Sequence, residues 1–143
     1  MDSPGDLISN LLKTGRKEPD AELDQLAHQV IGAAIEVHRA LGPGLLEGVY
    51  EKALCIEFEL RGIAFRTQSR VGIAYKGRSV GKGKLDLIVG DRLIVELKAV
   101  EKLAPIHLAQ TISYLRMTNR ALGLLINFNV PVLKEGIRRV VLS

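Results

Sequence analysis

The spacing of apolar residues changes once along the chain, and this change constrains the fold more than any other feature. Before Gly62, apolar residues recur every three or four positions, as on amphipathic helices. From Ile63 they recur at a period near two, as on β-strands. Helices followed by strands, and then by one more helix and strand, indicate a mixed fold of the α/β (α+β) class.

Three helices are predicted. The first starts near Asp20 and ends at Gly42-Pro43-Gly44, and the second runs from about Leu45 to Arg61, with Gly62 as a C-terminal cap. The third starts at Pro105, which suits a first helical turn, and reaches about Asn119. Its predicted buried side consists of Leu108, Ile112 and Leu115.

Three strands, over residues 63–75, 78–89 and 92–100, are predicted to form an antiparallel meander with turns at Lys76-Gly77 and Gly90-Asp91. Residues 121–128 are nearly all apolar, as expected for a strand that is covered on both faces. Residues 137–142 are predicted to add an edge strand.

The length and composition favour one domain. A chain of 143 residues with 47% apolar content can build one core, which we expect over residues 21–143. Residues 1–20 combine prolines, glycines and charges, so we expect a loosely ordered N-terminal arm. A net charge of +4 permits binding to a polyanion without requiring it.

The sequence also indicates a location. Cys55 is the only cysteine, which excludes an intrachain disulfide and fits a reducing compartment. The longest apolar stretches fall far short of the roughly 20 residues that a membrane span needs, and the first residues lack the pattern of a secretory signal. We therefore expect a soluble, cytoplasmic protein.

Three charged residues stand inside two otherwise apolar strands: Asp86, Glu96 and Lys98. Lone buried charges are strongly disfavoured, so these groups should face water or neutralise one another around an ion. Alternation places Glu96 and Lys98 on the same face of their strand. Asp86 opposes Glu96 if the loop has an odd number of residues centred on Asp91, whereas a two-residue turn would pair Asp86 with Val95 unless a bulge restored the pairing.

These residue types suit phosphodiester hydrolysis. Two carboxylates on adjacent strands can hold Mg²⁺ or Mn²⁺, and a nearby lysine can orient a water molecule or offset charge on a phosphate. The spacing Asp-x9-Glu-x-Lys is loose, however, and plain surface ion pairs fit the same residues.

A longer set of motifs resembles a known family. The segment from Gly44 to Tyr50 has the Gly-x-x-Glu-x-x-Tyr signature of the bacterial family named GxxExxY, and the resemblance covers about Leu23 to Leu142. Other similar segments are residues 37–44, 95–103 and 124–128. That family is placed among the PD-(D/E)XK nuclease-like proteins, with a restriction-endonuclease-like core of a helix, three antiparallel strands, a helix and a further strand.

The resemblance implies a site. It implies that Asp86 and Glu96 bind metal, that Lys98 is catalytic and that Glu47 is an additional acidic residue. Gln110 resembles a glutamine that this superfamily often places near the metal-bound water. The proline of the superfamily name is absent, since Leu85 precedes Asp86.

Three further residues are accessory candidates. Tyr50 shares a helix face with Glu47 but could equally be packed in the core. Tyr114 could form a polar stripe with Gln110 and His107, or lie on a solvated helix face. His38 closes the first helix, where helix capping fits better than catalysis.

Two classes of function follow. The first is a Mg²⁺- or Mn²⁺-dependent nuclease acting on DNA or RNA. The second is a catalytically silent module of the same fold that binds nucleic acid or a protein partner, with assembly into a homo-oligomer also open. Basic residues scattered over residues 66–84 could form a phosphate-binding rim, or alternation could divide them between faces. An aromatic content of 4% argues against a stacking platform for single strands.

Overall fold

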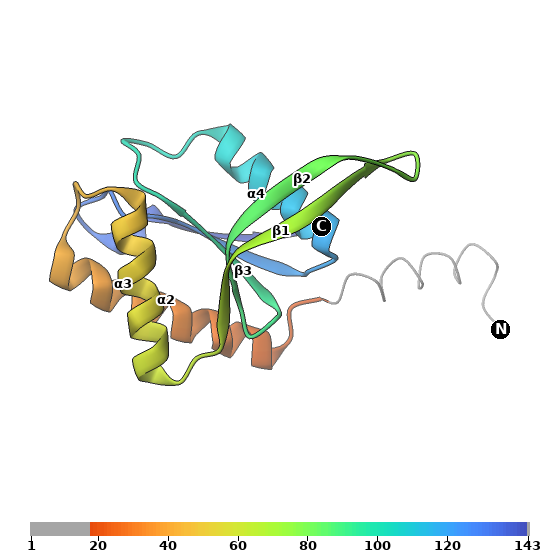
Figure 1. Cartoon of the computed structure of the whole chain (residues 1–143). Helices are drawn as coiled ribbons and strands as arrows, with labels where there is room; N and C mark the ends of the chain where they lie inside the picture. The colour runs from red at the N-terminus through yellow and green to blue at the C-terminus, as the bar shows by residue number, and fades with distance from the viewer. Residues whose placement is uncertain (1–17, 143) are drawn as a thin grey trace.

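The computed structural model describes residues 18–142 (Figure 1). The elements are α2 (Ala21–Leu41), α3 (Glu47–Arg61), β1 (Phe65–Tyr75), β2 (Arg78–Val89), β3 (Leu93–Lys98), α4 (Pro105–Thr118), β4 (Leu122–Asn127), the 3-10 helix η1 (Leu133–Gly136) and β5 (Ile137–Val141). The predicted α/β class and the predicted order of elements are confirmed. Of the N-terminal segment predicted over residues 1–20, residues 1–17 lie outside the described part of the chain.

The five strands form one sheet in the order β1-β2-β3-β4-β5. The first three strands are antiparallel to one another, which confirms the meander, and β5 pairs with β4 at the edge. β3 and β4 are parallel because α4 carries the chain back across the sheet between them. All six residues of β4 are buried, as expected for a strand that is covered on both faces.

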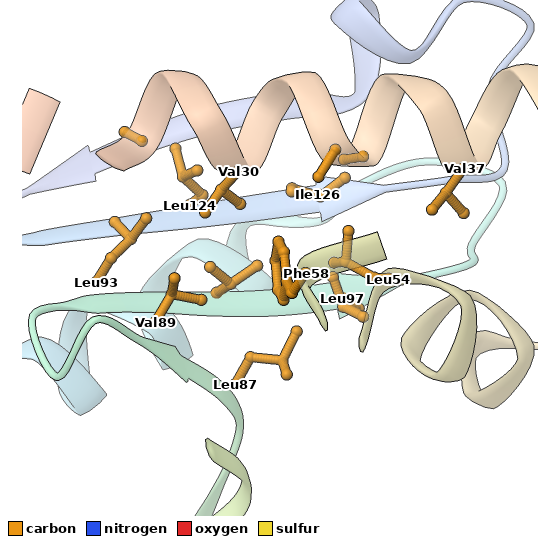
Figure 2. Packing of buried hydrophobic residues seen from close by; sticks show 14 of the residues in the cluster. Val30, Val37, Leu54, Phe58, Leu87, Val89, Leu93, Leu97, Leu124 and Ile126 are labelled. Carbon is orange, nitrogen blue, oxygen red and sulfur yellow. The ribbon is translucent and has the colours of Figure 1, made fainter. Parts of the chain in front are cut away.

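Helices cover both faces of the sheet. α2 and α3 pack on one face, where their apolar stripes meet β3 and β4, as Val30, Val37, Leu54 and Phe58 show in Figure 2. α4 packs on the other face through Leu115 and its neighbours. None of the described helices is both long and apolar enough to traverse a bilayer.

The buried side of α4 agrees with the prediction at Leu115, which is buried, and at Ile112, which packs against the same cluster, but differs at Leu108. Leu108 is 41% exposed, whereas Thr111, Tyr114 and Leu115 are buried. A glycine on the sheet makes room for Thr111, because a Cβ at Gly123 would lie 3.1 Å from the Thr111 methyl carbon. The sheet thus leaves room for the polar side of α4, a pairing that helix periodicity alone does not reveal.

The outer part of the β1–β2 hairpin, from Ser69 to Lys84, projects beyond the body of the protein in Figure 1, and we call it the arm. Its tip is the predicted turn at Lys76-Gly77, where both residues have positive φ (49° and 77°), as a tight hairpin turn requires. One side of the arm faces α4. The other side is exposed.

Candidate active site

The connection between β2 and β3 is a three-residue loop, Gly90-Asp91-Arg92. The strands pair Leu87 with Val95 and Val89 with Leu93, so the register is centred on Asp91. Gly90 and Asp91 both have positive φ, and the Arg92 N–H donates to the carbonyl of Val89 at 3.1 Å. The odd-numbered loop that the site requires is confirmed.

Asp86 and Glu96 meet where β2 separates from β3. Regular pairing ends at Leu87, one residue short of Asp86. There the Asp86 N–H donates to Glu96 Oε1 at 3.0 Å, and the Leu97 N–H donates to Asp86 Oδ2 at 2.9 Å. Each carboxylate therefore accepts a hydrogen bond from the backbone of the opposite strand. These two side chains hold the opening between the strands in a defined geometry.

The strand β2 turns sharply at Asp86. Leu87 and Val89 pack with α2 and α3, whereas Leu85 packs in the cluster under α4. In a regular strand, residues two apart share a face, so the change of layer between Leu85 and Leu87 marks a strong twist. Asp86 lies at this twist and is half-buried.

Glu96 has a strongly perturbed acidity. Glu96 is 4% exposed, and burial together with the charge of Asp86 raises the pKa of Glu96 to about 8. The Asp86 N–H and the Lys98 ammonium act in the opposite direction. Burial next to a second carboxylate thus favours the protonated form of Glu96 near neutral pH when no cation is bound.

Glu47 lies within electrostatic range of the same groups. It is the first residue of α3, and burial is the largest cause that raises the pKa of Glu47. The charges of Asp86 and Glu51 raise this pKa further, while Lys98 lowers it. The N-terminus of α3 therefore brings a third carboxylate towards the opening between β2 and β3.

Lys98 is half-buried and lies two residues after Glu96, on the same face of β3. Across residues 18–142, no carboxylate forms an ion pair with Lys98 within 4.0 Å. Its ammonium group acts on Glu47 and Glu96 as a nearby charge instead.

The carboxylates fit a hard divalent cation in chemistry, although they form a pair and not a closed cage. In the part of the chain that the structure describes, no three His, Cys, Asp or Glu side chains lie close enough to hold a metal ion. One oxygen each of Asp86 and Glu96 accepts a backbone hydrogen bond, which leaves Asp86 Oδ1 and Glu96 Oε2 for a cation. A cation between them would also offset the repulsion that raises the pKa of Glu96.

Tyr50 supports the site from inside the core. Its side chain is fully buried, and its ring stacks on Phe128 with centroids 4.5 Å apart. Its hydroxyl donates to the carbonyl of Gly42 at 2.6 Å and accepts from the Leu45 N–H at 3.1 Å. Tyr50 thereby fixes the loop that leads into Glu47. Of the two readings that the sequence left open, the packed one describes its position.

His38 also has a structural position. It is 8% exposed, and its Nε2 lies 2.8 Å from the carbonyl oxygen of Val130, in the segment after β4. Its own carbonyl accepts from the Gly42 N–H at the end of α2. The His38 ring therefore ties the end of α2 to the segment after β4, a structural contact different from the helix capping that the sequence favoured.

The polar residues of α4 have different partners. His107 Nδ1 accepts from the Ala104 N–H at 2.9 Å and so caps the helix, whereas Tyr114 is buried against Gly83. Gln110 is exposed and its amide donates to the Tyr114 hydroxyl at 3.4 Å. No hydrogen bond joins any of the three to Asp86 or Glu96 among the described residues.

Two polar contacts near the site were missed from the sequence. Asn127 lies opposite Lys98 in the β3–β4 register, is 2% exposed, and its amide bonds the N–H and the carbonyl of Val100 at 3.0 and 2.9 Å. Gln68 has positive φ and donates to Glu51 of α3. A polar residue that ends an apolar strand was the available signal for Asn127, whereas nothing in the sequence marked Gln68.

One of three comparisons with known proteins identifies a family for this chain. No curated protein and no solved structure shows significant similarity to the chain. A family described as the PD-(D/E)XK nuclease superfamily matches residues 24–140, which extend from the first turn of α2 to Val140 in β5. The chain belongs to the PD-(D/E)XK nuclease superfamily.

Proposed function

We propose that the protein is a divalent-metal-dependent nuclease that hydrolyses phosphodiester bonds of nucleic acid. The observation that carries this proposal is the reciprocal bonding of Asp86 and Glu96 across the opening between β2 and β3, with Lys98 on the same face as Glu96. Membership of the PD-(D/E)XK nuclease superfamily supports it.

Each residue has a proposed role. Asp86 and Glu96 hold Mg²⁺ or Mn²⁺ through the oxygens that the backbone does not use. Such an ion, when bound, polarises the phosphodiester and lowers the pKa of a coordinated water molecule. Lys98 orients the attacking water or offsets negative charge that develops on the phosphate. Glu47 assists from the N-terminus of α3, and Gln110 from α4.

Within the superfamily, we infer membership of the GxxExxY family. The structural roles of its signature residues support this inference. Gly44 has a φ of 97°, Glu47 begins α3, and Tyr50 bonds the loop between α2 and α3. Each position thus needs its residue type: glycine for left-handed backbone, an acid at the helix start, and a hydroxyl-bearing ring in the core.

The test is a cleavage assay with labelled single- and double-stranded DNA and RNA in Mg²⁺, Mn²⁺ or EDTA. The wild type should cut at least one substrate with metal and none in EDTA. Asp86→Asn should lose cleavage by roughly 10³-fold, because several kcal/mol of transition-state stabilisation depend on the cation. Lys98→Met should lose about 10²-fold. Glu101→Gln, an exposed carboxylate three residues beyond Lys98, serves as the matched control.

A second candidate function is a catalytically silent module that binds nucleic acid. One observation favours it, since the described residues bring together a pair of carboxylates at short range and no closed group of three. Strong, salt-dependent binding with no cleavage under any metal would support this alternative. Cleavage that survives both Asp86→Asn and Lys98→Met would contradict the proposed site.

A further inference from the structure

The arm, residues 69–84, carries an unbalanced positive charge. It holds five basic residues, and no acidic residue occurs between Leu60 and Leu85. The basic residues of the arm are Arg70, Lys76, Arg78, Lys82 and Lys84. Across residues 18–142, none of the five has an ion-pair partner within 4.0 Å. This part of the surface therefore offers uncompensated positive charge.

The strand register gathers three of these charges on one face. Arg70 pairs directly with Lys84, and Lys82 pairs with Gly72. Directly opposed residues share a face, so Arg70, Lys82 and Lys84 lie on the same side of the ribbon. Alternation, which could have divided the basic residues between the two faces, keeps these three together.

The other face of the arm is turned towards α4. Val71 packs against the cluster that contains Tyr114, and a Cβ at Gly83 would lie 2.8 Å from the Tyr114 ring. Val71 and Gly83 are half-buried, whereas Arg70, Lys82 and Lys84 are exposed. The basic face is consequently directed away from the body and is open to a partner.

This face is arranged at a cost to the isolated protein. Like charges directly opposite one another on neighbouring strands, such as Arg70 and Lys84, destabilise a sheet. Gly72 pairs with Lys82, and nothing lies within 4 Å of a Cβ added at Gly72. The surface beside Lys82 is therefore open to a partner. A bound polyanion would relieve the repulsion between these side chains, and this relief would favour binding.

We propose that the basic face of the arm binds the phosphate backbone of double-stranded DNA, with the ribbon lying in the major groove. A two-stranded β-ribbon fits the major groove of B-form DNA, whereas the major groove of A-form RNA is too narrow for it. Single strands favour several stacking rings, and Tyr75 is the one aromatic residue of the arm. This inference names the substrate class of the proposed nuclease and depends on that proposal only for cleavage at Asp86.

The arm also predicts a footprint. Lys84 lies two residues from Asp86, and the tip at Gly77 lies nine residues away along β2 and its turn, roughly 30 Å at the rise of a strand. That length corresponds to roughly nine base pairs of duplex at 3.4 Å each. DNA bound by the arm should be protected over about this distance on one side of the cleavage point.

The test measures binding in EDTA, so that it does not depend on cleavage. Fluorescence anisotropy of a labelled 20-base-pair DNA between 50 and 200 mM salt compares the wild type with the combined variant Arg70→Gln, Lys82→Gln, Lys84→Gln. Three lost phosphate contacts should make the negative slope of log K against log salt shallower by about 2.7, and affinity should fall more than about tenfold. The control, Arg39→Gln, Arg116→Gln, Lys134→Gln, removes the same charge from exposed sites outside the arm and should stay near the wild type.

Several results would overturn the inference. These are equal losses in the arm variant and the control, or wild-type binding to single-stranded DNA or duplex RNA as tight as to duplex DNA. Lys82→Gln alone should make this negative slope shallower by about 0.9, which keeps the test valid if the combined variant misfolds. If duplex binding depends on the arm while no metal supports cleavage, the proposed nuclease function fails and the arm inference stands. If cleavage is metal-dependent while binding ignores the arm, the reverse holds.

Discussion

The two ends of the strand β2 lie in opposite environments. Its last three residues, Leu87 to Val89, are buried in the sheet and pair with β3. Its first seven, Arg78 to Lys84, belong to the arm, where six of the seven are exposed. The strand β2 thus begins in an exposed region that is rich in charge and ends in a buried region that is packed with apolar side chains.

The difference shows how the two regions share their tasks. Removing apolar surface from water stabilises the fold through β3, β4 and the inner end of β2. The arm buries little and concentrates like charges, so we expect it to contribute little to stability and propose that it serves binding. Asp86 lies at the border, where rigid packing on one side can position a carboxylate for a substrate delivered from the other.

The largest expected effect separates chemistry from binding. With duplex DNA and Mg²⁺, Asp86→Asn should lower kcat by roughly 10³-fold, because it removes a proposed metal ligand. The arm variant with Arg70, Lys82 and Lys84 replaced by Gln should instead raise KM, because its contacts form equally in the bound ground state and the transition state. Steady-state kinetics measure both. A fall in kcat of similar size in the arm variant would break the comparison.

The next effect concerns pH and the buried carboxylate pair. The pKa of Glu96 is raised to about 8 from 4.5, so the folded state holds a proton that the unfolded state has released between these values. In EDTA, the stabilising contribution of Glu96 to the free energy of unfolding should therefore be fully present below pH 4.5. This contribution should fall by close to 1.4 kcal/mol per pH unit from pH 5.5 to 7.5.

Urea unfolding of the wild type and of Glu96→Gln at these pH values measures this contribution. The substitution leaves a neutral group, so its stability should lack that decline. Mg²⁺ should reduce the decline in the wild type, because a cation binds the ionised carboxylates. Parallel pH profiles of wild type and variant in EDTA would refute the assignment to Glu96.

A matched pair of valines compares packing in the two regions. Val95 is fully buried in β3, and Val80 on the arm is 62% exposed. Val95→Ala should cost about 2 kcal/mol, from two lost methylene equivalents and the cavity that remains. Val80→Ala should stay within about 0.5 kcal/mol. Chemical denaturation measures both, and equal losses would mean that the arm is part of the cooperative core.

The smallest expected effect compares two turns. Gly90 and Gly77 have φ of 57° and 77°, so alanine at either position costs about 1–2 kcal/mol of backbone strain. A Cβ at Gly90 would also lie 2.8 Å from Leu26 Cδ2, whereas nothing lies within 4 Å at Gly77. Gly90→Ala should lower global stability, while Gly77→Ala should increase hydrogen exchange in the arm alone. Equal loss of global stability would contradict the independence of the arm.

Much of the fold could be predicted from local patterns. Hydrophobic period located the helices and strands, and glycine and proline located most of their ends, because these signals act over a few residues. The parallel pairing of β3 with β4 follows from the helix between them. The helix period located Leu115 on the buried side of α4, but the burial of Thr111 could not be predicted, since it depends on Gly123 in a distant strand.

The sequence by itself singled out Asp86, Glu96 and Lys98 as candidate site residues, because charge inside apolar strands is costly without a partner. It left the loop at Asp91 open between two registers. Only the tertiary structure decided that β2 twists away from β3 at Asp86, that Glu47 approaches from α3, and that Tyr50 supports the loop from inside the core. The physical reason is distance along the chain, because these contacts join segments whose relative placement is set by packing of the whole core and not by any local preference.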